Sequence, residues 1–397
     1  MAVVGYGGKV TSYDLAVGVK INMDELIYMI SPTDSPFING IGTDGRQLLS
    51  SSGVDQQEFK WMDEELLLPR AQTAGTGAGG AGDTTITVAA ADSYKFQVDD
   101  LLNIGEEGGV ANGAIKRITA INNSTGVIDV SDWANGSAWP ATTDHATTGD
   151  DTVICVGTAL PEGSDPGTAR SADRTIHSNY TQIFGPTPIH MSRSEQQVSR
   201  YGVSDEFAKQ VYGRSVENVI TREQAYLYGK PVNDTSTKRR STGGLMNFIT
   251  TNTDSSTTTL TIAALETLMQ KCYNAGGIPD LLIANPASFA TLNAVSDSGR
   301  VRTTIDDPRR GRVPVASVFT EFGETQMVRN RWCHTESAFV VQKENVSRRI
   351  MQPLVVEALA KTGDSDKVQI VCEEGLQVKG QSHMARFTNL TGYTDTP

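Results

Sequence analysis

Histidine and cysteine side chains are the first place to look for catalytic chemistry in this 397-residue chain. Cys333 and His334 are adjacent and have the types of a nucleophile and its base. Neighbouring residues on a strand point to opposite faces, so this pair is not placed for proton transfer. The five histidines show no metal-ligand spacing such as i, i+4 on a helix. The four cysteines are scattered, with no metal-knuckle or redox spacing, which favours buried free thiols: Cys155, Cys272, Cys333 and Cys372.

Two other motifs have a chemical interpretation and a simpler structural one. Asp63, Glu64 and Glu65 are consecutive carboxylates, which acid–base catalysis or a metal site would use. On an exposed strand they are more simply an acidic patch that faces solvent or a partner. The glycine-rich run 75–82 lacks both a Gly-Lys-Ser/Thr ending and a following helix, so it is a linker and not a phosphate cradle. The sequence therefore predicts no catalytic, cofactor-binding or metal-binding residues, no cofactor and no enzyme.

Five arginines crowd one loop that also contains Asp306 and Asp307. They are Arg300, Arg302, Arg309, Arg310 and Arg312. One interpretation is a solvated loop with internal ion pairs. The other is a subunit contact at which these arginines meet acidic side chains of a neighbour.

Composition and charge restrict the function classes. The formal net charge is −12, and residues 1–165 carry 8 basic against 23 acidic residues. An acidic first half argues against a dedicated nucleic-acid binder, which needs a basic footprint. This asymmetry is typical of an ordinary solvated acidic module, and it is also what a self-associating chain uses for steering. No apolar run is long enough to span a membrane, and no secretory signal is visible, so we expect a soluble protein made in a cytoplasm.

The first 190 residues predict segments that need support from elsewhere. Residues 1–55 combine glycine and proline breaks with apolar side chains such as Leu26, Phe37 and Ile38, so an arm is expected to lie across its own domain or a neighbour. Residues 56–68 and 176–184 are strand-like. Between them, short strands are expected at 85–88, 100–104, 114–121, 126–130 and 153–156. This order predicts a small all-β module inserted into a long hairpin through flexible linkers. We expect that segments 1–55 and 56–190 cannot bury their apolar side chains within a single molecule.

A long helix and an α/β layer follow. Ser204 is the expected N-cap and Gly229-Lys230-Pro231 ends the helix, with an apolar stripe running from Ala208 through Tyr212 to Leu227. Further helices are expected at 262–274 and 286–295. Strands are expected at 280–284, 311–319, 324–331, 337–342, 350–356, 367–374 and 376–379. The fold class is therefore α+β.

This order of elements, together with local motifs, resembles the major head proteins of tailed bacteriophages with the HK97-like fold, in the subfamily with a β-rich insertion. Matching stretches cover nearly the whole chain. They are LIYMISPTDSPFING (26–40), Phe59-Lys60-Trp61, NYTQIF (179–184), 198–202, RSTGGLMNF (240–248) and LLIANPASF (281–289). No single motif is diagnostic, and the resemblance rests on their order.

The resemblance implies a domain layout and an assembly role. It implies an N-terminal arm (1–55), extended-loop (E-loop) strands (56–72 and 172–195), an inserted β-rich domain (73–171), a peripheral domain (196–240 and 346–397) with a spine helix at 204–229, and an axial domain (241–345). The expected subunit interface comprises Phe59, Lys60, Trp61, Asp63, Glu64 and Glu65, with the arginines at 300, 302, 309, 310 and 312. Some relatives crosslink a lysine to an asparagine between subunits; Lys60 is the one position worth testing, and no crosslink is expected.

The implied function is a major capsid protein whose hexamers and pentamers form an icosahedral head around double-stranded DNA, without sequence-specific binding. The implied partners are other copies of the chain and a portal protein, with either a separate scaffolding protein or none, and a decoration protein as a further candidate; no membrane is involved. The implied location is the virion capsid, assembled in the host cytoplasm. Two alternatives stay open: a phage tail or baseplate structural protein, and a hydrolase with an α/β core.

Overall fold

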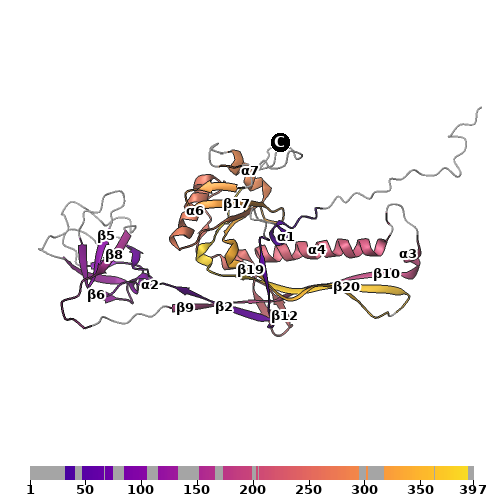
Figure 1. The fold of residues 1–397 in the computed structure, drawn as a ribbon, viewed down its shortest axis with the longest axis horizontal. Coiled ribbons are helices and arrows are strands. Elements are labelled where there is room, and N and C mark those ends of the chain that lie inside the picture. Colours follow the sequence, from indigo (N-terminus) through magenta and orange to yellow (C-terminus); the bar gives the residue numbers. More distant parts are fainter. Residues whose placement is uncertain are drawn as a thin grey trace, which may run out of the picture. The chain divides into compact units, whose positions relative to one another are not determined.

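The computed structural model describes residues 32–40, 47–66, 68–74, 85–104, 115–132, 152–165, 173–198, 203, 205–294, 301–302, 317–361 and 363–391. The chain divides into two compact units (Figure 1). One comprises Met62–Ile176, and the other comprises Met1–Trp61 with His177–Pro397.

The unit Met62–Ile176 contains a six-stranded antiparallel sheet. In spatial order its strands are β3 (Arg70–Gln72), β8 (Thr152–Thr158), β5 (Asp100–Ile104), β6 (Ile115–Asn122), β7 (Val127–Asp132) and β4 (Thr85–Thr87), with the short helix α2 (Ala90–Ser93) beside them. Leu102, Ile118, Ile128 and Val153 are fully buried in its own apolar core. All five strands expected in this region are present. Residues 70–72, which the sequence left outside the module, add β3 at the sheet edge.

A two-stranded ribbon is formed by β2 (Glu58–Glu65) and β9 (Asp173–Tyr180). Both strands overlap the strand-like segments expected at 56–68 and 176–184. The hydrogen bond from Thr181 N to Gln57 O, 2.9 Å, closes one end of the ribbon.

A four-stranded sheet in the second unit has the order β1 (Ser50–Gly53), β19 (Val346–Ala358), β20 (Ser365–Val378) and β10 (Gln182–Ser192). β1 runs parallel to β19, and the other neighbours are antiparallel. The sequence predicted two strands at 367–374 and 376–379, whereas β20 is continuous. The two predicted strands end and begin on either side of Gly375, which lies inside β20. Gly375 permits a close approach there, since a Cβ would lie 2.8 Å from Tyr180 O and 2.9 Å from the Phe59 ring.

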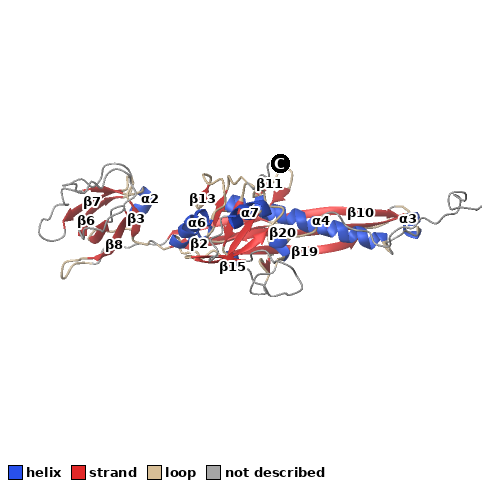
Figure 2. Cartoon of the chain, turned by 90° about the horizontal axis from the view of Figure 1, so that it is seen from above, coloured by secondary structure: helices blue, strands red, loops and turns tan. Residues whose placement is uncertain are grey.

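Helix α4 (Glu206–Tyr228) runs along one face of this sheet, over β10 and β20, and follows the short helix α3 (Arg193–Gln197) (Figures 1 and 2). It lies within the range 204–229 in which the sequence predicts a helix. Its N-cap is Asp205, whose side chain accepts a hydrogen bond from Ala208 N. Ser204, the expected cap, lies outside the described residues. The predicted apolar stripe is wrong at Tyr212, which is 60% exposed, because the buried face of α4 carries polar side chains.

A seven-stranded mixed sheet forms the rest of this unit. Its order is β13 (Thr253–Asp254), β21 (Ala385–Phe387), β18 (Ala338–Val341), β14 (Leu281–Ala284), β17 (Gly323–Arg329), β16 (Ser317–Thr320) and β15 (Val301–Arg302). Its side chains alternate between two cores. Leu282 packs in one core with α6 (Ile262–Asn274) and α7 (Pro286–Ala294), whereas Leu281 packs in the other with Leu227 of α4 and Leu376 of β20.

Short elements complete this unit. The hairpin β11 (Val232–Asp234) and β12 (Arg239–Ser241) and the helix α5 (Leu245–Phe248) follow α4 in the chain, and the 3₁₀ turns η1 (Lys343–Asn345) and η2 (Gln381–His383) flank the long strands. No helix in the described part of the chain is both long and apolar enough to cross a membrane.

The described part of the N-terminal arm packs into its own chain. Phe37 and Ile38 of α1 (Pro36–Asn39) are buried, as are Leu48 and Leu49, in the core that contains Leu227. The expectation that segments 1–55 and 56–190 cannot bury apolar side chains in one molecule is therefore wrong for these residues. They succeed because α4 and the two sheets form a core that a short irregular segment can close.

Candidate subunit interface

The β2–β9 ribbon carries most of the interface residues predicted from sequence. Phe59 and Trp61 alternate onto one face and are buried at 8% and 6% exposure. The Trp61 ring lies 5.6 Å from Phe248, edge-on, and 5.9 Å from the His177 ring. These two aromatic side chains therefore fix the base of the ribbon to its own chain and leave little surface for a neighbour.

The opposite face of β2 is open. Lys60 forms an exposed ion pair with Glu58 at 3.2 Å, and Glu64 forms another with Arg174 of β9 at 3.1 Å. Exposed pairs of this kind contribute little to stability. Asp63 is half-buried, and the side chain of Glu65 lies outside the described residues.

Large apolar side chains lie between and beyond these ion pairs. Met62 is 66% exposed, Ile176 64%, Leu66 72% and Leu68 59%. A two-stranded ribbon is marginally stable in water, and one with this much exposed apolar surface needs a further layer. The ribbon is the place where the described chain most clearly lacks one.

The predicted arginine cluster is mostly outside the structural description. Arg302 lies in the short strand β15, paired with Ser317 of β16, and nothing is described of its side chain. Arg300, Arg309, Arg310 and Arg312 lie outside the described residues. Their role at a subunit contact stays a prediction.

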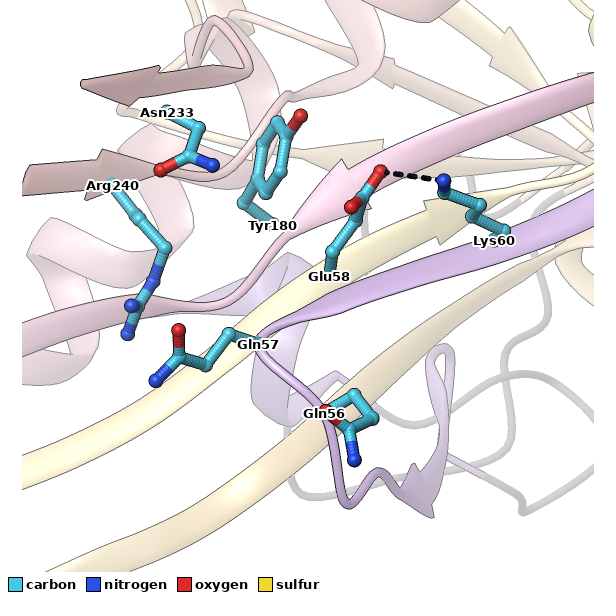
Figure 3. A pocket seen from close by; sticks show the side chains of 7 residues that line it. All are labelled: Gln56, Gln57, Glu58, Lys60, Tyr180, Asn233 and Arg240. Atoms are coloured by element: carbon cyan, nitrogen blue, oxygen red, sulfur yellow. Dashed lines mark ion pairs between the residues drawn. The ribbon is translucent and has the colours of Figure 1, made fainter. Parts of the chain in front are cut away.

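A shallow polar pocket of about 430 Å³ opens beside the base of the ribbon (Figure 3). Glu58 and Lys60 line it from β2, and Asn233 and Arg240 line it from the β11–β12 hairpin. Arg240 donates to Glu373 Oε1 of β20 at 2.9 Å, and the Thr181 hydroxyl donates to the same oxygen at 2.6 Å. The pocket has an ion pair and hydrogen bonds in its walls, but its side chains do not form a set for nucleophilic or acid–base catalysis.

An ion pair inside the molecule joins α4 to β20. Arg222 Nη1 lies 2.7 Å from Glu374 Oε1, and the two side chains are only 6% and 2% exposed. Burial opposes the charge on the Arg222 guanidinium, but the Glu374 carboxylate outweighs burial, so the pKa of Arg222 is raised. Partners this deeply buried depend on each other, because either one alone would be an uncompensated charge.

Glu223, the next residue of α4, holds the arm. Its Oε1 accepts hydrogen bonds from Phe37 N at 3.1 Å and from Asn330 Nδ2 at 2.6 Å. Its Oε2 is buried without a hydrogen-bond partner among the described residues. Burial raises the pKa of Glu223 to about 7, although the hydrogen bonds from the Phe37 and Ile38 amides and from Asn330 oppose this shift.

The Cys333–His334 pair lies beside the same core. Cys333 is 2% exposed, and the Tyr228 hydroxyl lies 3.3 Å from its Sγ. Burial raises the pKa of the Cys333 thiol, which disfavours the nucleophilic thiolate. His334 stacks edge-on against the Tyr228 ring, with centroids 4.5 Å apart. In the described part of the chain, no three or more His, Cys, Asp or Glu residues are grouped as a metal site.

Comparison with known proteins identifies the family. The family model described as SU10 major capsid protein matches residues 6–391. The chain belongs to this capsid family. It is a major capsid protein of a tailed phage, a structural subunit of the virion shell. The match over nearly the whole chain favours the capsid protein over the alternatives of a tail component and a hydrolase.

Solved structures support the fold of this capsid protein. A chain of Microbacterium phage Oxtober96 is 10% identical with a TM-score of 0.51, covering 97% of this chain and 100% of that one. A chain of Mycobacterium phage Bobi is 11% identical with a TM-score of 0.50 over the same shares. At this identity the likeness establishes a capsid-like fold with mixed helix and strand content. No curated protein matches the chain.

Sequence reasoning missed the residues that tie the capsid protein together. Arg222 and Glu223 lie in the long helix, and charged side chains there are expected at the surface. The available signal was the isolated Arg-Glu pair between Ile220 and Tyr226, on the side assigned to the core. The partners, Glu374 and Asn330, are more than a hundred positions away.

Proposed function

We propose that this capsid protein builds its shell through the HK97-like arrangement, with each part of the chain in a distinct role. Residues 1–55 act as the arm, 56–72 and 172–195 as the E-loop, and 73–171 as an inserted β domain, whose sheet also takes in β3 at residues 70–72. Residues 196–240 and 346–397 form the peripheral domain, and 241–345 the axial domain. The separate core of the unit Met62–Ile176 supports the inserted domain, and the packing of α4 on β10 and β20 supports the peripheral domain.

The observation that carries the proposal is the exposed ribbon. Met62, Leu66 and Ile176 leave most of their apolar surface in water in the single chain. Burying each such side chain contributes roughly 1.5–3 kcal/mol, so a neighbour that covers the ribbon gains substantially. The Asp63–Glu65 carboxylates and Lys60 then lie at the rim of that contact. Phe59 and Trp61 act at the interface indirectly, by holding the ribbon in place.

The proposed partners follow from this role. Copies of the chain associate as hexamers and pentamers, and the shell encloses double-stranded DNA without reading its sequence. A portal protein, and a scaffolding or a decoration protein, complete the head, which is assembled in the host cytoplasm. The chain performs no catalysis. The arginines at 300, 302, 309, 310 and 312 contact acidic side chains of a neighbour.

The test is the assembly of the full chain and of two ribbon variants. The wild-type chain is expected to sediment as shells or capsomers and to show them by negative-stain microscopy. Met62→Ser with Ile176→Ser should lower shell yield about tenfold or more, because each site forfeits buried apolar area. The matched control, Tyr94→Ser with Val98→Ser, changes exposed apolar residues outside the ribbon. A wild-type chain that stays a compact monomer at high concentration would contradict the proposal.

A further inference from the structure

The β11–β12 hairpin is a short projection whose two faces differ in chemistry. Its register pairs Asn233 with Arg240, and Val232 and Asp234 with Ser241 and Arg239. Because side chains alternate along a strand, Asn233 and Arg240 share one face, and Val232 and Arg239 share the other. The hairpin therefore places two consecutive arginines in opposite environments.

The inner face of the hairpin contacts other residues of its own chain. Arg240 lies in the pocket wall and reaches Glu373, with both side chains largely buried. At the base, the fully buried Asn179 donates to Thr242 Oγ1 at 3.1 Å and accepts from Gly243 N at 2.7 Å. Gly229 closes the other side, where a Cβ would lie 2.3 Å from Thr242 O. The hairpin is thus rigidly anchored at its root.

The turn is also fixed, and it presents a lysine in an unfavourable conformation. Asp234 accepts hydrogen bonds from the amides and hydroxyls of Ser236 and Thr237. These bonds hold the pKa of the Asp234 carboxyl down at about 2. Lys238 follows with φ +56°, a left-handed conformation that glycine adopts at much lower free energy.

The outer face carries Val232 and Arg239, and also the Asp234 carboxylate opposite Arg239. Lys238 in the turn and Lys230 before the hairpin add two further cations. Lys230, Lys238 and Arg239 are exposed, and Val232 is 46% exposed. None of the three cations forms an ion pair with any other residue within the described ranges. Arg240, one position away, differs because it forms an ion pair with Glu373. The combination is a preorganised basic tip with an apolar contact beside it.

We propose that this outer face docks onto an acidic segment within residues 1–165 of a second copy of the chain. That segment is the complementary surface, because residues 1–165 carry 8 basic and 23 acidic residues in a protein of net charge −12. The exposed Val232 favours a protein partner over nucleic acid, and three cations are a small footprint for phosphate binding. The inference rests on the proposed assembly and adds the surfaces that meet.

The experiment combines crosslinking with charge reversal in the full-length chain. Shells grown from a mixture of ¹⁴N-labelled and ¹⁵N-labelled chains are treated with a carbodiimide, which joins lysine directly to a contacting carboxylate. Mass spectrometry is expected to find Lys230 or Lys238 of one isotope joined to an Asp or Glu within 1–165 of the other. Crosslinks from these lysines only within one copy, or only to acids beyond residue 165, would overturn the proposal.

Charge reversal gives the second readout. K238E with R239E should lower shell yield at least tenfold. Because R239E sets a second carboxylate opposite Asp234, K238E alone is the variant whose melting temperature should be unchanged while its shell yield falls. The control, K271E with K379E, reverses two exposed lysines elsewhere and should assemble normally. Normal assembly of K238E with R239E, including assembly with only a loss of retained DNA, would overturn the docking role. A wild-type chain that does not assemble would instead contradict the proposed function itself.

Discussion

Two extended β structures in this capsid protein differ in how much of their apolar surface the single chain buries. The sheet of β19, β20 and β10 is covered on one face by α4, so that Ile370, Cys372 and Leu376 are fully buried, while Val356 on β19 is 48% exposed. The β2–β9 ribbon has no such layer over Met62 and Ile176, which are more than 60% exposed. The difference indicates that the chain stabilises the first structure by itself and leaves the second for a neighbouring copy.

The buried ion pair between Arg222 and Glu374 joins α4 to β20, in addition to apolar packing. Removing one of these two charges should therefore lower the stability of the fold strongly. Arg222→Met would leave the Glu374 carboxylate buried and unpaired, which is expected to lower the free energy of unfolding by about 3–5 kcal/mol. Arg222→Met with Glu374→Leu should recover most of this loss, because it removes both buried charges. Urea unfolding followed by circular dichroism measures both effects.

The control for this prediction lies on the same helix. Arg214 and Glu217 form an exposed ion pair at 2.6 Å, with side chains 45% and 59% exposed. Arg214→Met should change stability by less than about 0.5 kcal/mol, since exposed i, i+3 pairs contribute little. Equal effects at Arg222 and Arg214 would show that burial is not what gives the first pair its importance.

The attachment of the arm to the covered side should depend on pH. The folded protein retains the Glu223 proton up to about pH 7, whereas an unfolded chain releases it near 4.5. The folded state therefore binds more protons at Glu223 between these values, so the contribution of Glu223 to stability is fully present below pH 4.5 and is lost as pH rises through 7. The loss is about 3 kcal/mol at 1.36 kcal/mol per pKa unit. Asp34, paired with the exposed Arg331, is the nearest other carboxylate.

Glu223→Gln tests this dependence directly. The amide keeps an oxygen that can accept from Phe37 N and Asn330 but cannot ionise. Urea midpoints for the variant should change less between pH 5 and pH 8 than those of the wild type. An identical pH dependence in both proteins would assign the effect to other groups.

The smallest expected effect is at the open ribbon. Met62→Ser with Ile176→Ser should change the stability of the unassembled chain by no more than about 0.5 kcal/mol per site, because exposed side chains contribute little to folding. Phe59→Ala, only three positions from Met62 but buried, should lower stability by about 3–5 kcal/mol. Thermal melting of the unassembled proteins distinguishes the two. A large loss in the first variant would mean that the ribbon is completed internally.

Local patterns predicted most of the elements and few of the contacts. The helix at 262–274 and the module strands near 100–104 and 153–156 follow from periodicity and turn residues, which are local. Gly375 shows the limit: in sequence it is a strand breaker, and only the approach of Phe59 and Tyr180 shows why it lies inside a strand.

The candidate interface shows the same limit. The segment 59–65 was correctly placed on a strand, but alternation alone could not show that Phe59 and Trp61 face Phe248 and not a neighbour. The basic outer face of the β11–β12 hairpin was also missed. Its meaning depends on Arg240 reaching Glu373 while Arg239 does not, and this contact spans 133 positions.

Hydrogen exchange on the unassembled chain and on the assembled shell tests the central claim most directly. Amides of β19 and β20 should be protected to the same extent in both states, because α4 and the neighbouring strands already cover them. Amides in the open part of the ribbon, at residues 62–65 of β2 and 173–176 of β9, should exchange rapidly in the unassembled chain and become protected at least tenfold on assembly. Equal protection of β2 and β9 in both states would contradict the claim that a neighbouring copy completes the ribbon.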